Sequence, residues 1–349
     1  MSLPEPGRFS TTGPAAYWYP ALRADEIGSA PKAFRRFDTP LVAFRDAFGR
    51  AAVLVDRCPH RNTPLSLGRC VRGELECAYH GWRFDGDGRC TAVPALIGPA
   101  DTPARRASAI PTLESQGMVW IWMHDSEPSG LPYEIPGVGV EAYEVIRYEA
   151  GFEATLYATA ENILDVPHTS FLHKGLFRVA GHRNRVTVKV ARRQDRAEAE
   201  FIGEPRPAGV IGSLLAPGGG ELRHVDRFIM PGIAQVEYGL GDDSHVIVTN
   251  LLVPVRPFET QMFTVVALRL PVATSIVRRI AEPVARRIVE QDARILSALT
   301  GTTRAFGGER FVSTPVDLLA PAILKLLRWG EQGSVPDVPD DVREVEMDI

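Results

Sequence analysis

The sequence predicts an α+β protein in which a small, mostly β domain precedes a larger domain whose antiparallel sheet is covered by helices. Three observations predict this fold class: short strand-like runs before a Pro- and Gly-rich segment at 128–139, longer strand-like runs after it, and two long helical stretches. The Pro- and Gly-rich segment is the best linker candidate in the chain. We therefore expect domains at 1–140 and 141–349.

The strand-like runs of the first domain are short and are separated by turn residues. In the last of them Trp120 and Trp122 share one face, because side chains alternate along a strand. This pattern of short strand-like runs predicts a small β domain. The runs lie at 41–44, 51–55 and 118–123.

The strand-like runs of the second domain are longer and are expected to form one antiparallel sheet, with helical stretches at 157–173 and 273–299 covering it. A helix-like run at 317–329 could cap a pocket or pack on a neighbouring subunit, and the sequence does not choose between these. The strand-like runs lie at 185–191, 225–230, 234–240, 245–253 and 261–270.

Composition and charge exclude several classes of protein. The 349 residues are 45% hydrophobic and 23% charged, which excludes a chain too polar to collapse. The net charge of −4 offers no excess positive field for a phosphate backbone, so nucleic acid is not an expected partner. We see neither an export signal nor an apolar run of about 18 residues. We therefore expect a cytoplasmic protein with no membrane partner.

Two loops each pair one cysteine with one histidine: Cys58 with His60, and Cys77 with His80. A structural zinc site is one interpretation, because thiolate and imidazole both suit zinc. Zinc fingers, however, usually pair Cys with Cys and His with His. The mixed arrangement favours a [2Fe-2S] cluster in which one iron takes both thiolates and the other takes both imidazoles. Four cysteines in all are too few for a disulfide scaffold.

A second group of polar residues follows in the first helical stretch. Asn162, Asp165 and His168 recur every three residues and would share a helix face. An isolated Asp-x-x-His is often only a hydrogen-bonded pair. His173 would lie about 140° from that face in regular geometry, so the helix must bend or break for both histidines to bind one ion. Pro167 supplies a cause for a break.

The C-terminal helical stretch offers a carboxylate. Asp292 lies four residues after Ile288 and four before Leu296, in an apolar stripe that also includes Ile295 and Leu299, whereas Glu290 faces away. A buried carboxylate must be paired, protonated or bound to a cation. A salt bridge to an arginine is one interpretation. Two histidines and one carboxylate with open positions form the arrangement expected of oxygen-activating non-haem Fe(II).

These motifs together resemble the Rieske non-haem iron oxygenases over nearly the whole chain. The group that the chain resembles most comprises vanillate and dicamba O-demethylases, toluenesulfonate methyl-monooxygenase and the saxitoxin-pathway hydroxylases. Ala78 departs from the more usual Pro, and Leu299 stands near where relatives often carry Gln. The matching segments are Cys58-Pro59-His60-Arg61, Cys77-Ala78-Tyr79-His80-Gly81-Trp82 and Glu290-Gln291-Asp292-Ala293-Arg294-Ile295-Leu296.

The resemblance implies a role for each matching residue. It implies a Rieske domain followed by a helix-grip, START-like catalytic domain, with His168, His173 and Asp292 as ligands of a mononuclear Fe(II). It implies that Asp165 bridges an iron-ligating histidine to His80 of a neighbouring subunit, usually in a homotrimer, and that Asn162 lies near the iron. The cluster ligands implied are Cys58, His60, Cys77 and His80.

The resemblance also bears on two aromatic residues of the cluster loops. It implies that Tyr79 hydrogen-bonds the cluster and that Trp82 packs where a partner subunit docks. Ordinary aromatic packing is the alternative for both.

The function implied is a terminal oxygenase α subunit that uses O2 and two electrons to hydroxylate, or to O- or N-demethylate, a small organic substrate that is expected to be aromatic or polycyclic. Electrons would come from NAD(P)H through a separate reductase, with or without a ferredoxin, since the chain has no Gly-x-Gly-x-x-Gly loop after a strand. Three alternatives stay open: a ring-hydroxylating dioxygenase, a Rieske electron-transfer protein, and a zinc-containing binding protein.

The remaining cysteines and histidines lack ligand spacing. Cys70 and Cys90 are expected to be structural thiols. The other histidines are expected to lie at the surface or to form hydrogen bonds; they are His124, His182, His224 and His245.

Overall fold

The structure is a computed structural model, and it divides into two compact units. One unit comprises Ala15–Glu134, and the other comprises the described residues of Ile135–Ile349 together with Gly13 and Pro14. The described Gly13 belongs with the second unit, because its N–H donates to the Glu331 carboxylate at 2.9 Å. The structure describes residues 13–173, 184–205, 222–241, 244–271, 274–333 and 340–349.

The first unit is built from three small antiparallel sheets, as expected of a mostly β domain. Their strand orders are β1-β11-β10, β2-β3-β4-β9 and β5-β6-β7-β8. All three predicted runs are found as strands, in β3, β4 and β11. The sequence analysis missed the other strands of this unit, of which β5 to β10 have only two to four residues each and so show no clear period. The strands are β1 (Trp18–Arg23), β2 (Lys32–Arg36), β3 (Thr39–Arg45), β4 (Ala51–Val55), β5 (Arg69–Val71), β6 (Glu74–Glu76), β7 (Arg83–Phe84), β8 (Cys90–Ala92), β9 (Ala109–Ile110), β10 (Thr112–Ser115) and β11 (Met118–Trp122).

The core of the first unit has two apolar clusters on the opposite faces of β3 and β4. Leu41 and Ala43 of β3 belong to one cluster, and Val42 and Phe44 belong to the other. This division follows from the alternation of side chains along a strand that is buried on both faces. The second apolar cluster also contains Cys58, Cys77 and Cys90, so the two Cys-His loops are anchored in this core.

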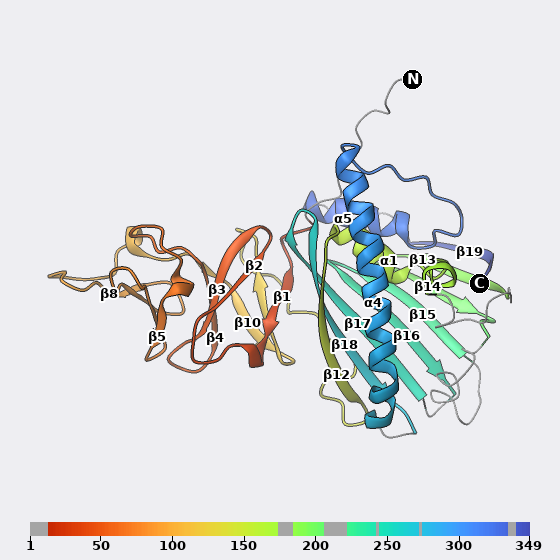
Figure 1. The fold of residues 1–349 in the computed structure, drawn as a ribbon, viewed down its shortest axis with the longest axis horizontal. Helices are drawn as coiled ribbons and strands as arrows, with labels where there is room; N and C mark the ends of the chain where they lie inside the picture. Colours follow the sequence, from red (N-terminus) through yellow and green to blue (C-terminus); the bar gives the residue numbers. More distant parts are fainter. Residues whose placement is uncertain (1–12, 174–183, 206–221, 242–243, 272–273, 334–339) are drawn as a thin grey trace. The chain divides into compact units, whose positions relative to one another are not determined.

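The second unit contains one eight-stranded antiparallel sheet in the order β12-β18-β17-β16-β15-β14-β13-β19 (Figure 1). The five predicted runs became β13, β15, β16, β17 and β18, which confirms the antiparallel sheet. The sequence analysis missed β12, β14 and the edge strand β19. The strands are β12 (Glu144–Phe152), β13 (Arg185–Arg192), β14 (Arg196–Ile202), β15 (Leu222–Ile229), β16 (Ile233–Leu240), β17 (Ser244–Arg256), β18 (Glu259–Arg269) and β19 (Asp341–Asp348).

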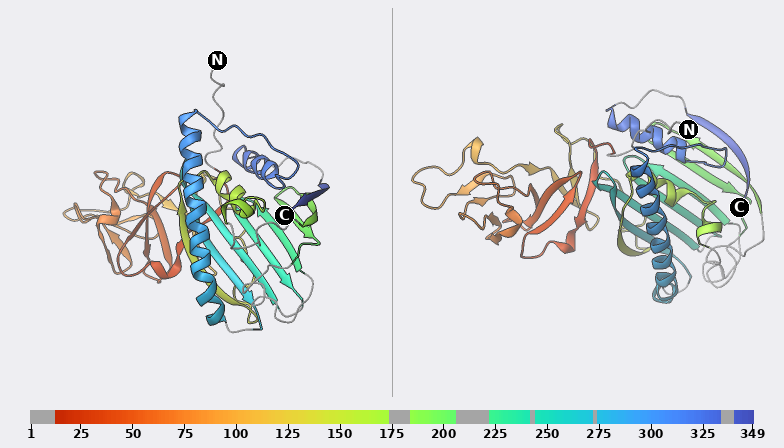
Figure 2. Two further views of the ribbon diagram at one scale, coloured as in Figure 1. Left: turned by 45° about the vertical axis from the view of Figure 1, so that its right-hand side comes forward. Right: turned by 45° about the horizontal axis from the view of Figure 1, so that its top comes forward.

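Helices cover one face of this sheet, as predicted (Figures 1 and 2). The short helix α1 (Leu156–Leu164) packs on β15, β16 and β17, α5 (Ala320–Glu331) packs against β14, and the long helix α4 (Thr274–Ala305) packs against β12. Helices α4 and α5 also contact α1 on that face. None of the described helices is long and apolar enough to cross a membrane.

The predicted helix at 157–173 is two helices. Thr155 caps the start of α1 by accepting a hydrogen bond from the Ala158 N–H at 3.2 Å. The helix ends at Leu164, and α2 (Thr169–Leu172) follows after a turn that contains Pro167. Proline lacks an N–H and disfavours helical backbone in the residue before it, so the predicted break is confirmed.

Candidate metal centres

The two Cys-His loops of the first unit have the same backbone construction. The Cys58 N–H donates to the Thr63 carbonyl, and the Cys77 N–H donates to the Trp82 carbonyl, each at 2.8 Å. Both loops therefore close over six residues that begin at the cysteine. The cysteine and the histidine of each loop therefore project from a single hydrogen-bonded turn.

The same turn requires left-handed backbone four residues after each cysteine. Asn62 has φ +62° and Gly81 has φ +68°, and their N–H groups donate to the carbonyls of Cys58 and Cys77 at 2.9 and 3.0 Å. Glycine and, among other residues, asparagine adopt this conformation most easily. The residue types at 62 and 81 thus follow from the loop geometry.

The loops bring together two thiols and two imidazoles. Cys58 and Cys77 are buried and in hydrogen-bond contact, and burial raises the pKa of the Cys58 thiol to about 11. The rings of His60 and His80 lie 4.5 Å apart, and Nδ1 of His60 is buried with no hydrogen-bond partner in the described part of the chain. Bound iron would stabilise the thiolates and satisfy that nitrogen, so this donor set fits a Rieske cluster.

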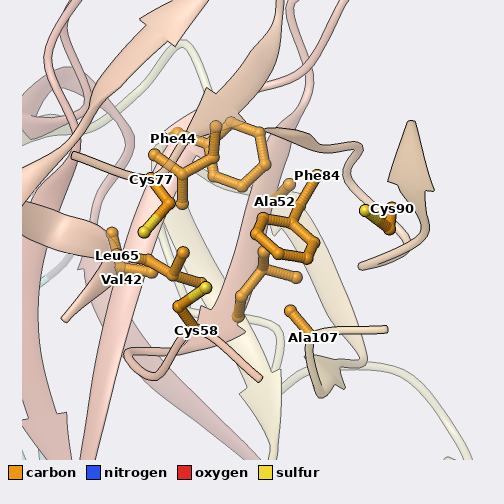
Figure 3. Packing of buried hydrophobic residues seen from close by; sticks show 11 residues of the cluster. Val42, Phe44, Ala52, Cys58, Leu65, Cys77, Phe84, Cys90 and Ala107 are labelled. Carbon is orange, nitrogen blue, oxygen red and sulfur yellow. The ribbon is translucent and has the colours of Figure 1, made fainter. Parts of the chain in front are cut away.

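The surroundings of the two cysteine sulfurs are apolar. Cys58 and Cys77 lie among Val42 and Leu65, whereas Cys90 lies beyond Phe84 (Figure 3). Cys90 is buried and Cys70 is partly buried, and both are free thiols. Both pack in or against the same apolar cluster, as expected of structural thiols.

The second centre joins the turn after α1 to the middle of α4. Nε2 of His168 and Nε2 of His173 lie 3.3 Å apart, and Oδ1 of Asp292 lies 3.6 and 3.2 Å from them. His173 is buried, and the three donor atoms fall within 4.8 Å of one another. Two imidazoles and one carboxylate that converge on one point fit a non-haem iron with open positions.

Comparison with known proteins agrees with both centres. Residues 17–103 match the model of the Rieske [2Fe-2S] domain, and residues 152–328 match the model of the vanillate O-demethylase oxygenase C-terminal domain. The second match covers half of the chain. The chain belongs to the vanillate O-demethylase-like Rieske non-haem iron oxygenases.

Individual relatives show how far the similarity extends. The chain is 37% identical over 169 residues to chlorophyllide a oxygenase, chloroplastic, of Chlamydomonas reinhardtii, covering 46% of this chain and 25% of that protein. It is 34% identical over 162 residues to the dicamba O-demethylase oxygenase component of Stenotrophomonas maltophilia, covering 45% of this chain and 47% of that protein. The chain thus matches from about a quarter to about half of the length of these relatives.

The fold is shared with a solved member of the family. A crystal structure of dicamba monooxygenase bound to 3,6-dichlorosalicylic acid superimposes with a TM-score of 0.78 at 22% identity, covering 91% of this chain and 97% of that chain. The Rieske oxygenase fold expected from the sequence is therefore confirmed. The cofactors of the family are a Rieske [2Fe-2S] cluster and a mononuclear iron, the latter at His168, His173 and Asp292. A structural zinc site in the cysteine loops is thereby set aside.

Neighbouring groups hold the iron-binding imidazoles of this Rieske oxygenase in one tautomer. Nδ1–H of His173 donates to Oε1 of Gln291 at 2.9 Å, and Nδ1–H of His168 donates to the Asp165 carbonyl. Each bond leaves the Nε2 lone pair directed toward the metal position. Despite the opposing effect of burial, the carboxylates of Asp165 and Asp292 raise the pKa of His168 to about 9 in the absence of metal.

The remaining predicted residues also lie at this centre. Oδ2 of Asp165 is 3.5 Å from Nδ1 of His168, and Nδ2 of Asn162 donates to Oδ1 of Asp292 at 3.5 Å. Asp165 ends α1 with non-helical φ and ψ, so the turn, and not a continuous helix face, brings Asp165 and His168 together. The prediction of one shared helix face was wrong in that respect.

The apolar stripe of α4 is rotated from its predicted position. Leu296 is buried and Glu290 is exposed, as predicted, but Ile295 and Leu299 are 48% and 39% exposed. Val289 and Asp292 are half-buried on the side of the helix that packs against β12 and α1. Asp292 has its ion pairs with histidines, and no arginine pairs with it in the described chain.

A cavity of about 700 Å³ lies beside the iron position. Asn162, Asp165 and all three iron-binding residues line it, together with mostly apolar side chains of the sheet and of α4. The cavity is large enough for a small organic molecule. The three side chains that would hold the iron thus lie at the wall of a cavity of substrate size.

The histidines without ligand spacing are hydrogen-bonded where the structure describes them. His124 contacts Ser126, and His245 contacts Glu237 at 2.9 Å. His182 lies outside the described residues. His224 is fully buried in the cavity wall between Glu204 and Asp226, a position that the sequence analysis missed. The alternation His224-x-Asp226 within a strand could have placed both side chains on one face.

The aromatic side chains of the cluster loops lie close to the imidazoles. The indole of Trp82 stacks on His60 with the ring centres 4.6 Å apart and the planes 5° apart. Tyr79 is exposed, with its ring centre 3.8 Å from that of His80. The hydrogen bond between Tyr79 and the iron–sulfur cluster stays a prediction. The packing of a partner subunit at Trp82 also stays a prediction.

Proposed function

We propose that this chain is the terminal oxygenase of a monooxygenase system that hydroxylates, or O- or N-demethylates, a small organic substrate. The balance is RH + O2 + 2 e⁻ + 2 H⁺ → ROH + H2O, and a hydroxylated methoxy or N-methyl group then loses formaldehyde. The observation that carries the proposal is the position of the His168, His173 and Asp292 centre on the wall of the 700 Å³ cavity. When bound, the cluster would supply single electrons and the mononuclear iron would supply O2 activation.

The residues of the chain would position these reactants. We assign Cys58, His60, Cys77 and His80 to the cluster, with His80 on the exposed side, where an electron donor can approach. The cavity would hold the substrate beside the iron and exclude water through its apolar lining. Asn162 would orient the Asp292 carboxylate through its hydrogen bond.

Electron transfer would pass between subunits. Asp165 contacts His168, and its carboxylate is partly exposed, which supports its role as a bridge to His80 of a partner subunit in a homotrimer. A separate NAD(P)H-dependent reductase, with or without a ferredoxin, would deliver the electrons. The cytoplasmic location expected from the sequence stays a prediction.

Isotope labelling tests the proposed function. The purified chain, reconstituted with iron and sulfide and supplied with a reductase, is incubated with candidate methoxy- and N-methyl-aromatic compounds under 18O2. One labelled oxygen atom per product or per formaldehyde supports monooxygenation, whereas two labelled atoms in one product indicate a dioxygenase. Reduction of the cluster without label in any organic product would indicate an electron carrier and would contradict the proposal.

A further inference from the structure

A row of polar side chains runs across the sheet at one wall of the cavity. Tyr148 on β12 lies opposite Thr264 on β18, and Thr264 lies opposite Asn250 on β17. Residues that lie opposite each other on antiparallel strands project from the same face of the sheet, so the three side chains are neighbours. Tyr148 and Asn250 both line the cavity. The strand register therefore places a phenol, a hydroxyl and a carboxamide in one line at the candidate substrate site.

These three side chains form one chain of hydrogen bonds. Oγ1–H of Thr264 donates to Oδ1 of Asn250 at 2.7 Å, and Thr264 also hydrogen-bonds the Tyr148 hydroxyl. A threonine hydroxyl has a single proton, so Tyr148 donates in the second bond. This direction suits the groups, because a phenol is a stronger donor than an aliphatic hydroxyl. Burial raises the pKa of Tyr148 despite the opposing effect of its hydrogen bond with Thr264, so the phenol keeps its proton.

The chain of hydrogen bonds leaves the amide nitrogen of Asn250 without a partner in the described chain. The Asn250 side chain is buried, at 6% exposed, and its one hydrogen bond there is the bond to Oδ1. Its Nδ2 is not sealed off by protein atoms, and the open space beside Asn250 is the cavity. The other buried amide of the described lining differs, because Nδ2 of Asn162 donates to Asp292. Asn250 therefore presents an unused donor to the cavity.

An unused donor in a buried wall favours one kind of ligand. Buried polar groups are nearly always hydrogen-bonded, and an unpaired one costs free energy. A hydrocarbon substrate would exclude water from Nδ2 of Asn250 and offer no acceptor in return. A carbonyl oxygen only accepts hydrogen bonds and an amide nitrogen only donates them, so the two groups match. A hydroxyl group would bring a proton that this nitrogen cannot accept.

We propose that Asn250 is a specificity residue that selects substrates with a carbonyl group, by donating from Nδ2–H to the carbonyl oxygen. Thr264 and Tyr148 act as positioning residues, since their hydrogen bonds hold Oδ1 of the amide away from the substrate. The apolar part of the substrate would lie along Val248 and Met262, which also line the cavity. This inference rests on the proposed function, because it takes the cavity to be the substrate site.

Infrared spectroscopy of a bound ketone tests this hydrogen bond directly. We would add 4′-methoxyacetophenone, labelled with 13C at the carbonyl, to the unreduced, metal-loaded full chain under anaerobic conditions. A donated hydrogen bond weakens the C=O bond, so the labelled stretch should lie at lower wavenumber than in a hydrocarbon solvent. Asn250→Leu, which keeps a similar volume and removes the donor, should return the stretch toward its value in that solvent.

Binding of matched probes measures the selectivity. In 4-isopropenylanisole a C=CH2 group replaces the C=O group of 4′-methoxyacetophenone at nearly the same shape. Equilibrium dialysis gives the Kd of each compound for the wild type and for Asn250→Leu. The substitution should lower the affinity for the ketone relative to the alkene by about tenfold, which corresponds to about 1.4 kcal/mol. A larger pair, 2-acetyl-6-methoxynaphthalene and its isopropenyl counterpart, is measured in the same way.

Two threonine variants separate positioning from general effects on the fold. Thr264→Val removes the hydroxyl that holds Oδ1 of Asn250, so the C=O shift and the relative affinity for the ketone should both decrease although the amide remains. Thr249→Val is the matched control and should leave both measurements unchanged. Thr249 is also buried on β17 and accepts from Nε2 of Gln235 at 3.3 Å, but it is not among the described residues that line the cavity.

The outcomes separate this inference from the proposed function. An unshifted stretch in the wild type, failure of both ketones to bind, or a shift and preference that persist in folded Asn250→Leu overturns the inference. If Asn250→Leu does not fold, equal results for Thr264→Val and Thr249→Val overturn it. Oxygen incorporation from 18O2 without a shifted stretch would keep the function and lose the inference. A shift that Asn250→Leu abolishes, without oxygen incorporation, would do the reverse.

Discussion

Oε1 of Gln291 accepts a hydrogen bond from Nδ1–H of His173 at 2.9 Å, one residue before the iron-binding Asp292. This bond joins two residues that are 118 positions apart in the chain. It holds His173 with its Nε2 lone pair directed toward the iron position. Helix α4 thus supplies one ligand through Asp292 and orients another through Gln291.

Removing this hydrogen bond should weaken iron binding. Gln291→Leu keeps the helix and leaves His173 free to rotate or change tautomer, so the affinity for the mononuclear iron should fall about 10- to 100-fold. Competition with a chelator measures this affinity. Glu290→Gln, at the exposed neighbouring position, is the control and should match the wild type. Unchanged affinity in Gln291→Leu would show that the bond does not orient the ligand.

Asp292→Ala should remove the mononuclear iron and spare the cluster. The substitution deletes the carboxylate ligand, and the two units have separate cores. Iron should fall from about three to about two atoms per chain, with an unchanged visible spectrum and no turnover. Metal analysis and absorbance measure this. Retained turnover would remove Asp292 from the ligand set.

Asp165→Asn should slow oxidation of the reduced cluster while both kinds of iron remain bound. The change removes the charge of the carboxylate beside His168 but leaves the backbone carbonyl that also accepts from it. Stopped-flow absorbance after mixing with substrate and O2 measures the rate. An identical rate in wild type and variant would take Asp165 out of the electron path.

The buried His224 predicts a pH dependence of stability. Its pKa is about 9 in the folded protein, above the ordinary value of 6.5, so its contribution is fully present below about pH 6.5 and is lost as pH rises through 9. This loss should be on the order of 3 kcal/mol. Urea unfolding of the iron-loaded protein at pH 6 and pH 9.5 measures it. His224→Gln should reduce the difference between the two midpoints, and an equal difference would contradict this prediction.

The core behind the cluster loops should tolerate truncation poorly. Phe84 is fully buried beside Cys58 and Cys90, and Phe84→Ala should cost about 3–5 kcal/mol. The loss of cluster absorbance on heating should occur at a lower temperature. Phe48, 82% exposed in the same unit, provides the control, since Phe48→Ala should change stability by less than about 0.5 kcal/mol. Equal effects of the two substitutions would contradict the packing described here.

Features of the structure were predictable from the sequence where they depend only on residues of the same loop or helix. The cysteine and histidine spacing of the two loops, the interruption near Pro167 and the inward position of Asp292 all follow from a few neighbouring residues. The strands β12, β14 and β19 were missed; in β19 most side chains are exposed, so its apolar residues do not alternate clearly. Its pairing with β13 decides its structure instead.

The sequence by itself determined which residues can bind metal, because ligand type and short spacing are local properties of the chain. Only the tertiary structure decided that Gln291 orients His173, and that Glu204 and Asp226 enclose His224 on the cavity wall. These contacts depend on which strands pair and in which register, and on where α4 crosses the sheet domain. Such long-range choices arise from the burial of many side chains at once, so no short segment contains them.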